Sequence, residues 1–159
     1  MSSHTRAILV SLMMCTMMLS RCLHLDNDNE KIIDESLKTY GVKIYSDGTD
    51  THLMLVDLRP YKVKGNLAAE SLSRANITCN KNGIPFDTEK PMITSGIRLG
   101  TQAITTRGFG LNECQKVGEL ITKVIKGLSE NPDDNSKIES EVRNEVIALT
   151  SSFPIYKNL

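Results

Sequence analysis

The segment TSGIRLGT, residues 94–101, sets a single arginine among small and apolar residues. The guanidinium of Arg98 keeps its charge and must be paired where it is buried, and its planar fork fits a carboxylate through two parallel hydrogen bonds. Gly96 and Gly100 stand two residues to either side and would let a ligand approach the backbone closely. Arg98 is therefore a candidate carboxylate-binding residue. The alternative is a structural ion pair between Arg98 and an internal Asp or Glu.

Two further stretches carry groups that could bind a ligand. Asn80, Lys81 and Asn82 offer two amides and an amine, which can hydrogen-bond a heterocycle or simply fix a turn. The loop TTRGFG, residues 105–110, precedes an expected helix whose free backbone N–H groups could hold an anion, or it only starts that helix. This loop has neither the P-loop lysine pattern nor the GxGxxG spacing of nucleotide-binding loops.

The composition excludes several classes of function. Lysine plus arginine and aspartate plus glutamate both number 19, so there is no excess positive charge to hold a nucleic acid or an anionic membrane. Aromatic residues make up 4 % of the chain, which disfavours a base-stacking surface. The four cysteines and three histidines show no metal-ligand spacing. We expect free thiols in a cytoplasmic protein, no metal site, and neither a nucleic acid nor a membrane as partner.

The hydrophobic pattern predicts the elements that position these residues. Glu30–Tyr40 has the apolar spacing of a helix, which Gly41 is expected to end. The run HLMLVDL, residues 52–58, has the length and character of a strand buried on both faces, and Pro60 helps to end it. Asn66 is expected to cap the next helix. The residues that share the apolar face of that helix are Leu67, Ala68, Leu72 and Ala75.

The second half of the chain continues the alternation. ITCN (77–80) and GIRLG (96–100) have the pattern of short strands, with a proline-containing loop at 83–91 between them. Apolar residues at three- and four-residue spacing from 111 to 128 predict an amphipathic helix. Ser136 and Glu139 are spaced as a capping box for a last helix. This order predicts an α+β fold with a sheet of about three strands, covered by helices on one face.

Residues 1–28 differ in character from residues 29–159, and we take them as a separate segment. Ala7–Leu19 is Met-rich and uncharged, and it is too short for a comfortable membrane span. It has the length of a signal-peptide core, but a small-x-small cleavage site does not follow it. Three interpretations stay open: a buried or partner-seeking helix, a poor targeting segment, or non-native coding sequence.

Three strings, taken in order, resemble one known family. They are SDGTDTHLMLVDLRP, ANITCNKNGIPFDTEKPMITSGIRLGT and TTRGFG. Together they are similar to the C-terminal part of serine hydroxymethyltransferase, a pyridoxal-phosphate enzyme that interconverts serine and glycine with tetrahydrofolate. The similarity runs from about Glu30 to the FPIY near the end of the chain. It implies the small C-terminal domain of a fold-type-I pyridoxal-phosphate enzyme, packed on a large cofactor-binding domain.

The resemblance also implies roles for two residues. Arg98 matches the arginine of the family that clamps the α-carboxylate of the amino acid, serine or glycine. Asn82 matches the asparagine that hydrogen-bonds the pterin of the folate. The bidentate clamp would orient the amino acid on the cofactor so that the reacting bond at Cα lies across the π-system of the ring.

The sequence departs from the family pattern where the chemistry is done. The lysine of the family that attaches pyridoxal phosphate directly follows a histidine in a threonine-rich run, and no lysine of this chain does so. We therefore expect this chain alone to bind no cofactor and to have no activity. The leading hypothesis is a truncated or split-gene product. The alternative is an interaction module that docks on a full-length enzyme or a separately encoded large domain. An exported binder, suggested only by Ala7–Leu19, is the third hypothesis.

Overall fold

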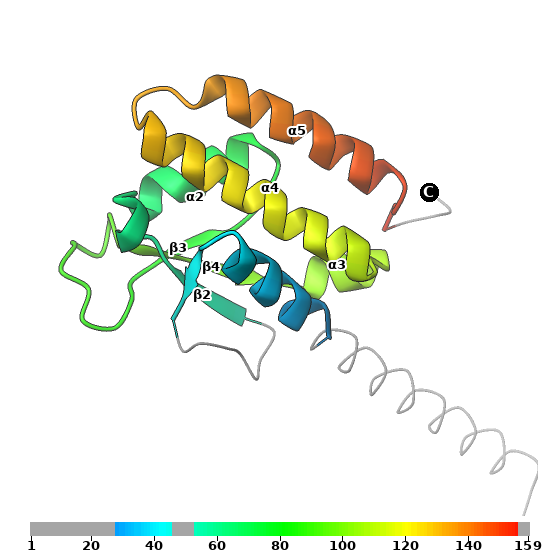
Figure 1. Ribbon diagram of the computed structural model, residues 1–159, viewed down its shortest axis with the longest axis horizontal. Coiled ribbons are helices and arrows are strands. Elements are labelled where there is room, and N and C mark those ends of the chain that lie inside the picture. Colours follow the sequence, from blue (N-terminus) through cyan, green and yellow to red (C-terminus); the bar gives the residue numbers. More distant parts are fainter. Residues whose placement is uncertain (1–27, 46–52, 156–159) are drawn as a thin grey trace, which may run out of the picture.

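Helices cover one face of a small antiparallel sheet in the structure, a computed structural model that describes residues 28–45 and 53–155 (Figure 1). The strands of the described part are β1 (Lys43–Ile44), β2 (Leu53–Asp57), β3 (Asn80–Asn82) and β4 (Gly96–Gly100). The helices are residues 28–39, the short 3-10 helix η1 (Arg59–Tyr61), α2 (Gly65–Arg74), α3 (Gln102–Arg107), α4 (Leu111–Glu130) and α5 (Ser136–Ser151). The predicted α+β class is confirmed.

The sheet has two unlike faces because its side chains alternate. Its strand order is β1-β2-β4-β3, and each neighbouring pair is antiparallel. One face packs against the helices through buried apolar side chains, and its members on β1, β2 and β4 are Ile44, Met54, Val56, Ile97 and Leu99. We call the other side the open face, because no helix of the described residues covers it. The strand β2, expected to be buried on both faces, is therefore covered by helices on one face only, which an antiparallel sheet tolerates.

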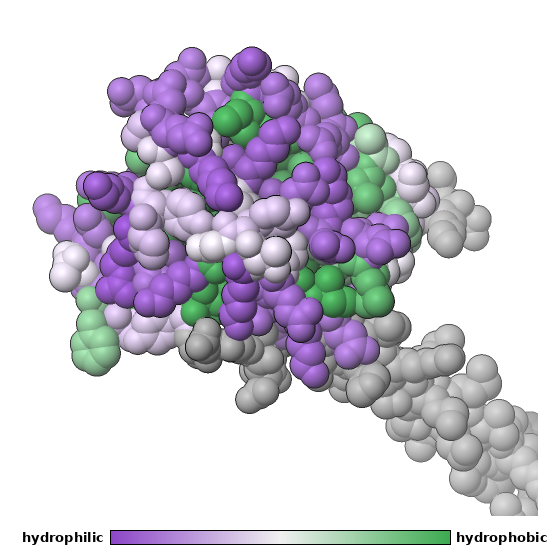
Figure 2. Space-filling model, in the orientation of Figure 1, coloured by the Kyte–Doolittle hydropathy of each residue, from purple (hydrophilic) through white to green (hydrophobic). Residues whose placement is uncertain are grey.

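The long helix α4 contributes a large apolar face to the core. Its buried side chains recur at three- and four-residue spacing and include Leu120, Ile121, Val124, Ile125 and Leu128. In Figure 1, α5 runs beside α4 on the side away from the sheet, and the segment 28–39 lies near the start of α4. The outer surface of α4 and α5 is mainly hydrophilic, as Figure 2 shows. The core therefore lies between α4 and the sheet.

Two helices, the segment 28–39 and α2, end in the same way. Gly41 and Asn76 lie just beyond them with positive φ angles of 84° and 62°. In each case the next amide donates to a carbonyl five residues earlier, at 2.9 and 2.8 Å, and these pairs are Val42 to Leu37 and Ile77 to Leu72. This is the Schellman arrangement, in which glycine or asparagine tolerates the left-handed backbone. The predicted end of the first helix at Gly41 is confirmed.

Several sequence predictions are corrected. The sheet has four strands rather than about three, because the two-residue strand β1 pairs with β2 and is too short to leave a periodic signal. Strand β3 spans residues 80–82 rather than 77–80, because Ile77 is used to close α2. Helix α3 was missed, since its β-branched residues Ile104, Thr105 and Thr106 are poor helix formers.

The predicted helix caps are also wrong. Asn66 lies inside α2, because the amides of Gly65 and Asn66 donate to loop carbonyls of Thr94 and Ile93, both at 2.9 Å. Ser136 and Glu139 form no capping box, since the Glu139 carboxylate bonds to α2 instead. Leu67 is 38 % exposed and does not belong to the buried face of its helix. The interpretations of Ala7–Leu19 concern residues outside the described part of the chain.

Candidate functional site

Arg98 lies on the open face in the middle of the sheet. Strand β4 buries Ile97 and Leu99 against the helices, so the alternation of the strand turns Arg98 to the opposite side, where it is exposed. Its cross-strand neighbours are Leu55 on β2 and Asn80 on β3. Cross-strand partners share a face, so these three side chains form one row.

The guanidinium of Arg98 has no internal counter-charge in the described part of the chain. No hydrogen bond or ion pair joins it to residues 28–45 or 53–155. The structural ion pair that the sequence left open is therefore absent among these residues. An arginine fork without a protein acid on a sheet face is able to accept a carboxylate from outside through two hydrogen bonds.

A second arginine, Arg59, follows β2 and is paired with an acid, unlike Arg98. Arg59 donates from Nη2 to Asp57 Oδ2 at 2.7 Å and from Nε to Asp57 Oδ1 at 3.0 Å. Burial raises the pKa of the Asp57 carboxyl, but the hydrogen bonds from Arg59 outweigh burial and hold that pKa below its usual value. The Asp57–Arg59 pair is thus a closed structural unit, whereas Arg98 keeps its donors available.

Gly96 allows the preceding loop to close against the sheet beside Arg98. A Cβ at this position would lie 2.7 Å from the Ile84 side chain and 2.7 Å from the carbonyl oxygen of Val56. Ile84 belongs to the loop 83–95 and is buried. Only glycine permits this approach, so Gly96 brings the loop and the end of β3 next to the strand that carries Arg98.

Asp87 holds this loop in place. Its carboxylate accepts hydrogen bonds from Ser95 Oγ at 2.6 Å, from the Ser95 amide at 2.8 Å, and from the amides of Glu89 and Ile84 at 3.0 and 3.3 Å. Burial raises the pKa of Asp87, but these hydrogen bonds outweigh burial and lower it to about 2. The carboxylate is charged at neutral pH and fixes the loop to the residue that precedes β4.

Asn82 stands at the end of β3, opposite Gly96 and on the same face as Arg98. The two residues are diagonal neighbours on adjacent strands, which corresponds to a Cα separation of roughly 7–8 Å. The half-buried Asn82 lines an open hollow of about 530 Å³ between β3 and the loop 83–95. Its Nδ2 donates to the carbonyl of Gly83 at 2.8 Å, which is the turn contact that the sequence also allowed. The structure thus places the two site residues predicted from sequence close together.

The third sequence candidate, residues 105–110, serves to join two helices. Gly108 has φ 83° and ends α3, and Gly110 precedes α4. The Glu113 carboxylate accepts a hydrogen bond from the Gly110 amide at 3.0 Å, so an internal carboxylate already occupies the start of α4. Residues 105–107 belong to α3 rather than to a loop, and only residues 108–110 lead into α4 as ordinary helix initiation. The Arg107 side chain of this stretch turns into a cavity between the sheet and the helices.

The described residues offer little nucleophilic or metal chemistry. Cys79 and Cys114 are free thiols, and burial raises the pKa of both to about 11, so they stay protonated at neutral pH. Residues 28–45 and 53–155 contain no cluster of three metal-ligating His, Cys, Asp or Glu side chains. The same residues include no helix long and apolar enough to cross a bilayer.

Sequence reasoning predicted the loop at 83–91 but missed the role of Asp87 in fixing it. A local signal existed, because Asp commonly accepts from the amide two residues later in a turn, as Asp87 does from Glu89. The stronger bonds come from Ser95, eight residues away, and the spacing alone carries no sign of them. Thr94 was also missed: its φ of 60° is unusual for a β-branched residue and directly precedes this contact.

Comparison with known proteins gives the class of this α+β domain. A family model described as Serine hydroxymethyltransferase matches residues 15–121. The chain is 82 % identical over 131 residues to a serine hydroxymethyltransferase of Pelagibacter ubique, which covers 82 % of this chain. It is 58 % identical over 130 residues to one of Paramagnetospirillum magneticum, and 59 % identical over 129 residues to one of a Marinomonas species. The chain belongs to the serine hydroxymethyltransferase family.

The matched relatives are much longer than this chain. The aligned region is 82 % of this chain but 30 % of the Pelagibacter relative, and the share is also 30 % for the relatives from Paramagnetospirillum and Marinomonas. The family match begins at residue 15, upstream of the boundary at residue 29 that the sequence suggested. That boundary stays a prediction.

Proposed function

We propose that this chain is the small C-terminal domain of a serine hydroxymethyltransferase, with Arg98 for the amino acid carboxylate and Asn82 for the folate pterin. The observation that carries the proposal is the unpaired Arg98 guanidinium on the open face, diagonal to Asn82. The identity of 82 % to the Pelagibacter relative supports the same assignment. In this proposal the domain boundary falls at residue 29, and the protein is cytoplasmic.

The chemistry of the two side chains suits this division of labour. The Arg98 fork would hold the α-carboxylate of serine or glycine in one orientation, and so fix which bond at Cα faces the reacting group. The Asn82 side chain donates one hydrogen bond, from Nδ2 to the carbonyl of Gly83. Its amide oxygen would accept a hydrogen bond from the pterin, and Nδ2 would turn from Gly83 to donate to the pterin as well. Asp87 and Gly96 would set the distance between these two contacts. Neither Arg98 nor Asn82 would transfer a proton.

The described residues do not fit pyridoxal phosphate, the cofactor that the family uses. A phosphate needs a cluster of donors, and helix N-termini are the usual source. The first amides of α2 donate to loop carbonyls, and the start of α4 faces the Glu113 carboxylate. Lys43 lies on the open face, but it belongs to the outer strand β1. It is opposite Asp57 and two strands away from Arg98. We therefore propose that the cofactor lies on a separate lysine-bearing domain and that this chain alone is inactive.

The second candidate function is a module that docks on such a domain or on a full-length enzyme without taking part in catalysis. It is favoured by the apolar residues Leu53 and Leu55 on the open face, where alternation normally places polar side chains. Both candidates use the same face. They differ in whether Arg98 contacts substrate.

A chimera separates the two candidates. Residues 29–159 of this chain would replace the matching region of the Pelagibacter relative, and serine saturation and turnover would be measured. We expect an active enzyme in which Arg98→Lys weakens serine binding and Arg98→Ala weakens it further, by about 1.5–3 kcal/mol, because a charged hydrogen-bonding partner is lost. Arg143→Ala is the matched control, since Arg143 is an exposed arginine on α5.

The outcome is decisive in both directions. An active chimera whose serine saturation is unchanged by Arg98→Ala would refute the clamp and favour the docking module. Asn82→Ala should weaken folate binding and leave serine binding unchanged. An equal loss of both affinities would show that Asn82 acts on the loop rather than on the pterin.

A further inference from the structure

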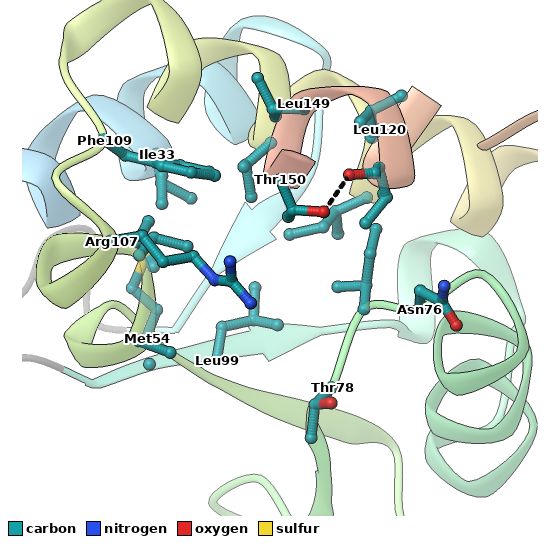
Figure 3. Close-up of a pocket in the computed structure, with 17 residues that line it drawn as sticks. Ile33, Met54, Asn76, Thr78, Leu99, Arg107, Phe109, Leu120, Leu149 and Thr150 are labelled. Atoms are coloured by element: carbon teal, nitrogen blue, oxygen red, sulfur yellow. Dashed lines mark hydrogen bonds between the residues drawn. The ribbon is translucent and has the colours of Figure 1, made fainter. Parts of the chain in front are cut away.

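A cavity of about 240 Å³ lies on the helix-covered side of the sheet. Its floor comes from Met54 and Leu99, which point from β2 and β4 toward the helices. Its walls come from α3, α4, α5 and the loop between α3 and α4, and they are largely apolar, with Phe109, Leu120 and Leu149 among them. Figure 3 shows these side chains around a common space. The cavity lies across the sheet from Arg98, because Leu99 and Arg98 point to opposite faces.

One charged side chain lines this cavity. Arg107, from the last turn of α3, extends its guanidinium into the space between Phe109 and Leu99 (Figure 3). Its Nη1 donates to the carbonyl of Phe153 at 2.9 Å, which holds the guanidinium in place. No Asp or Glu is among the lining residues, and no carboxylate of the described residues pairs with Arg107.

A guanidinium without an acid partner at an apolar cavity indicates a binding site for an anionic ligand. The low-dielectric walls strengthen its attraction for an anion, and the remaining N–H groups of the fork fit a carboxylate. A cavity of about 150 Å³ holds benzene in another protein, so 240 Å³ accommodates a larger apolar body. We propose that this cavity binds a small monocarboxylate with an apolar body, its carboxylate on Arg107 and its body against the floor of Met54 and Leu99.

The charge and shape of the site narrow the class of ligand. A single cation favours a singly charged carboxylate over a phosphate, which would need several donors. Asn76 and Thr78 supply a polar edge on the side opposite Arg107, as Figure 3 shows. A straight-chain fatty acid and an aryl carboxylic acid share this chemistry. A comparison of one probe from each group distinguishes between these two sources.

Titration calorimetry on the full 159-residue chain tests the proposal. The probes are octanoate, 2-naphthoate and octan-1-ol, the last being an uncharged match for octanoate. We expect saturable binding of at least one carboxylate, about tenfold or more tighter than the alcohol, because a charged hydrogen-bonded pair is made only with the acid. The carboxylate that binds more tightly shows whether the apolar part of the natural ligand is a straight chain or an aromatic ring.

Three variants connect the binding to this cavity. Arg107→Met should remove the preference for the acid and leave the alcohol unaffected, while Arg143→Met on the surface of α5 should change neither. Ala103→Leu should weaken all probes by filling space, since Ala103 lines the cavity. Arg107→Lys keeps a charge without the fork, and it should bind octanoate less tightly than the parent chain but still better than the alcohol. It serves as the second variant if Arg107→Met does not fold.

Three results would overturn the proposal. The first is no saturable binding of either carboxylate. The second is equal affinity for octanoate and octan-1-ol, which would show an apolar void without an anion site. The third is full carboxylate affinity in folded Arg107→Met or Ala103→Leu protein, which would place the binding elsewhere. None of these results bears on Arg98, so the proposed function is tested separately.

Discussion

At the scale of single residues, the charged side chains differ in whether the chain supplies a partner for them. Asp57 and Arg59 are two positions apart and neutralise each other, and Asp87 is satisfied by four donors. Arg98 and Arg107 have no acid partner among residues 28–45 and 53–155. A half-buried guanidinium beside apolar side chains costs desolvation free energy when it has no counter-charge, and Arg107 is in this position. Arg98 is exposed, and its fork is able to take a carboxylate from outside.

Asp87 gives a prediction for pH. Its pKa is lowered from the ordinary value of 3.8 to about 2 in the folded chain. A carboxyl with a depressed folded pKa stabilises the fold above its unfolded value, and this contribution is lost as the pH falls from about 4 toward 2. Asp87→Asn should lower the stability at pH 7 by about 1–2 kcal/mol, because charged hydrogen bonds to Ser95 become neutral. It should also flatten the dependence of the melting temperature on pH between about 5 and 2.5.

The control for this prediction is Asp133→Asn, an exposed carboxylate in the loop between α4 and α5. Thermal unfolding followed by circular dichroism measures both variants. Glu139 and Asp57 also have lowered pKa values, so part of the acid sensitivity should remain in Asp87→Asn. An Asp87→Asn profile parallel to that of the parent chain would contradict the role of Asp87.

The sequence indicated Arg98 and Asn82 as candidate site residues but did not predict which residues surround them. Both residues stand in strings that resemble a known family, and an arginine between glycines is visible in one dimension. The contacts that set their spacing join residues distant in the chain, such as Asp87 with Ser95 and Gly96 with Ile84. The apolar cavity at Arg107 draws on α3, α4, α5 and the sheet together. Such a cavity has no signature in local spacing.

At the scale of elements, strong periodicity predicted well and short elements failed. The helix expected at 111–128 and the strands expected at 52–58 and 96–100 correspond to α4, β2 and β4. Strand β1 and helix α3 are held by tertiary contacts rather than by their own pattern. The buried Glu139 illustrates the same limit: it joins α5 to Ser71 and Arg74 of α2 through bonds of 2.6 and 2.7 Å. Spacing alone suggested that it caps its own helix.

The packing of the segment 28–39 on α4 gives a prediction at this scale. A Cβ at Gly118 would lie 2.5 Å from Ser36 Oγ and 2.7 Å from Ser36 Cβ. Gly118→Ala should therefore destabilise the fold by about 1–3 kcal/mol through overpacking, although alanine gains about 1 kcal/mol of helix propensity. Urea unfolding measures the change.

A propensity control and a partial rescue accompany this variant. Ser140→Ala on the exposed side of α5 reports propensity without a close neighbour. Combining Gly118→Ala with Ser36→Ala removes the nearest atom and should recover part of the stability. A Gly118→Ala chain more stable than its parent would show that the two helices do not pack this closely.

At the scale of the whole molecule, the first question is where the folding unit begins. Asn29 Nδ2 donates to Thr105 Oγ1 at 3.0 Å, and Ile33 and Leu37 are buried in the core, so the segment 28–39 docks through residues from 29 onward. We expect residues 29–159 to unfold cooperatively, with a melting temperature close to that of residues 1–159. Circular dichroism melts of both chains measure this. A broad transition in the shorter chain would move the boundary toward residue 15, where the family match begins.

The open face leads to a prediction for the behaviour of the whole chain in solution. Leu53 is 39 % exposed there, next to Leu55 in the same face, and Leu67 on α2 is exposed to the same degree at 38 %. If the open face is a docking surface, apolar exposure on it should cause self-association of the isolated chain, whereas equal exposure on α2 should not. Sedimentation velocity over a range of concentrations measures this. Leu53→Thr keeps strand propensity and should shift the chain toward monomer. The matched variant Leu67→Gln should leave the association unchanged. An equal effect of both variants would show nonspecific hydrophobic association rather than a docking face.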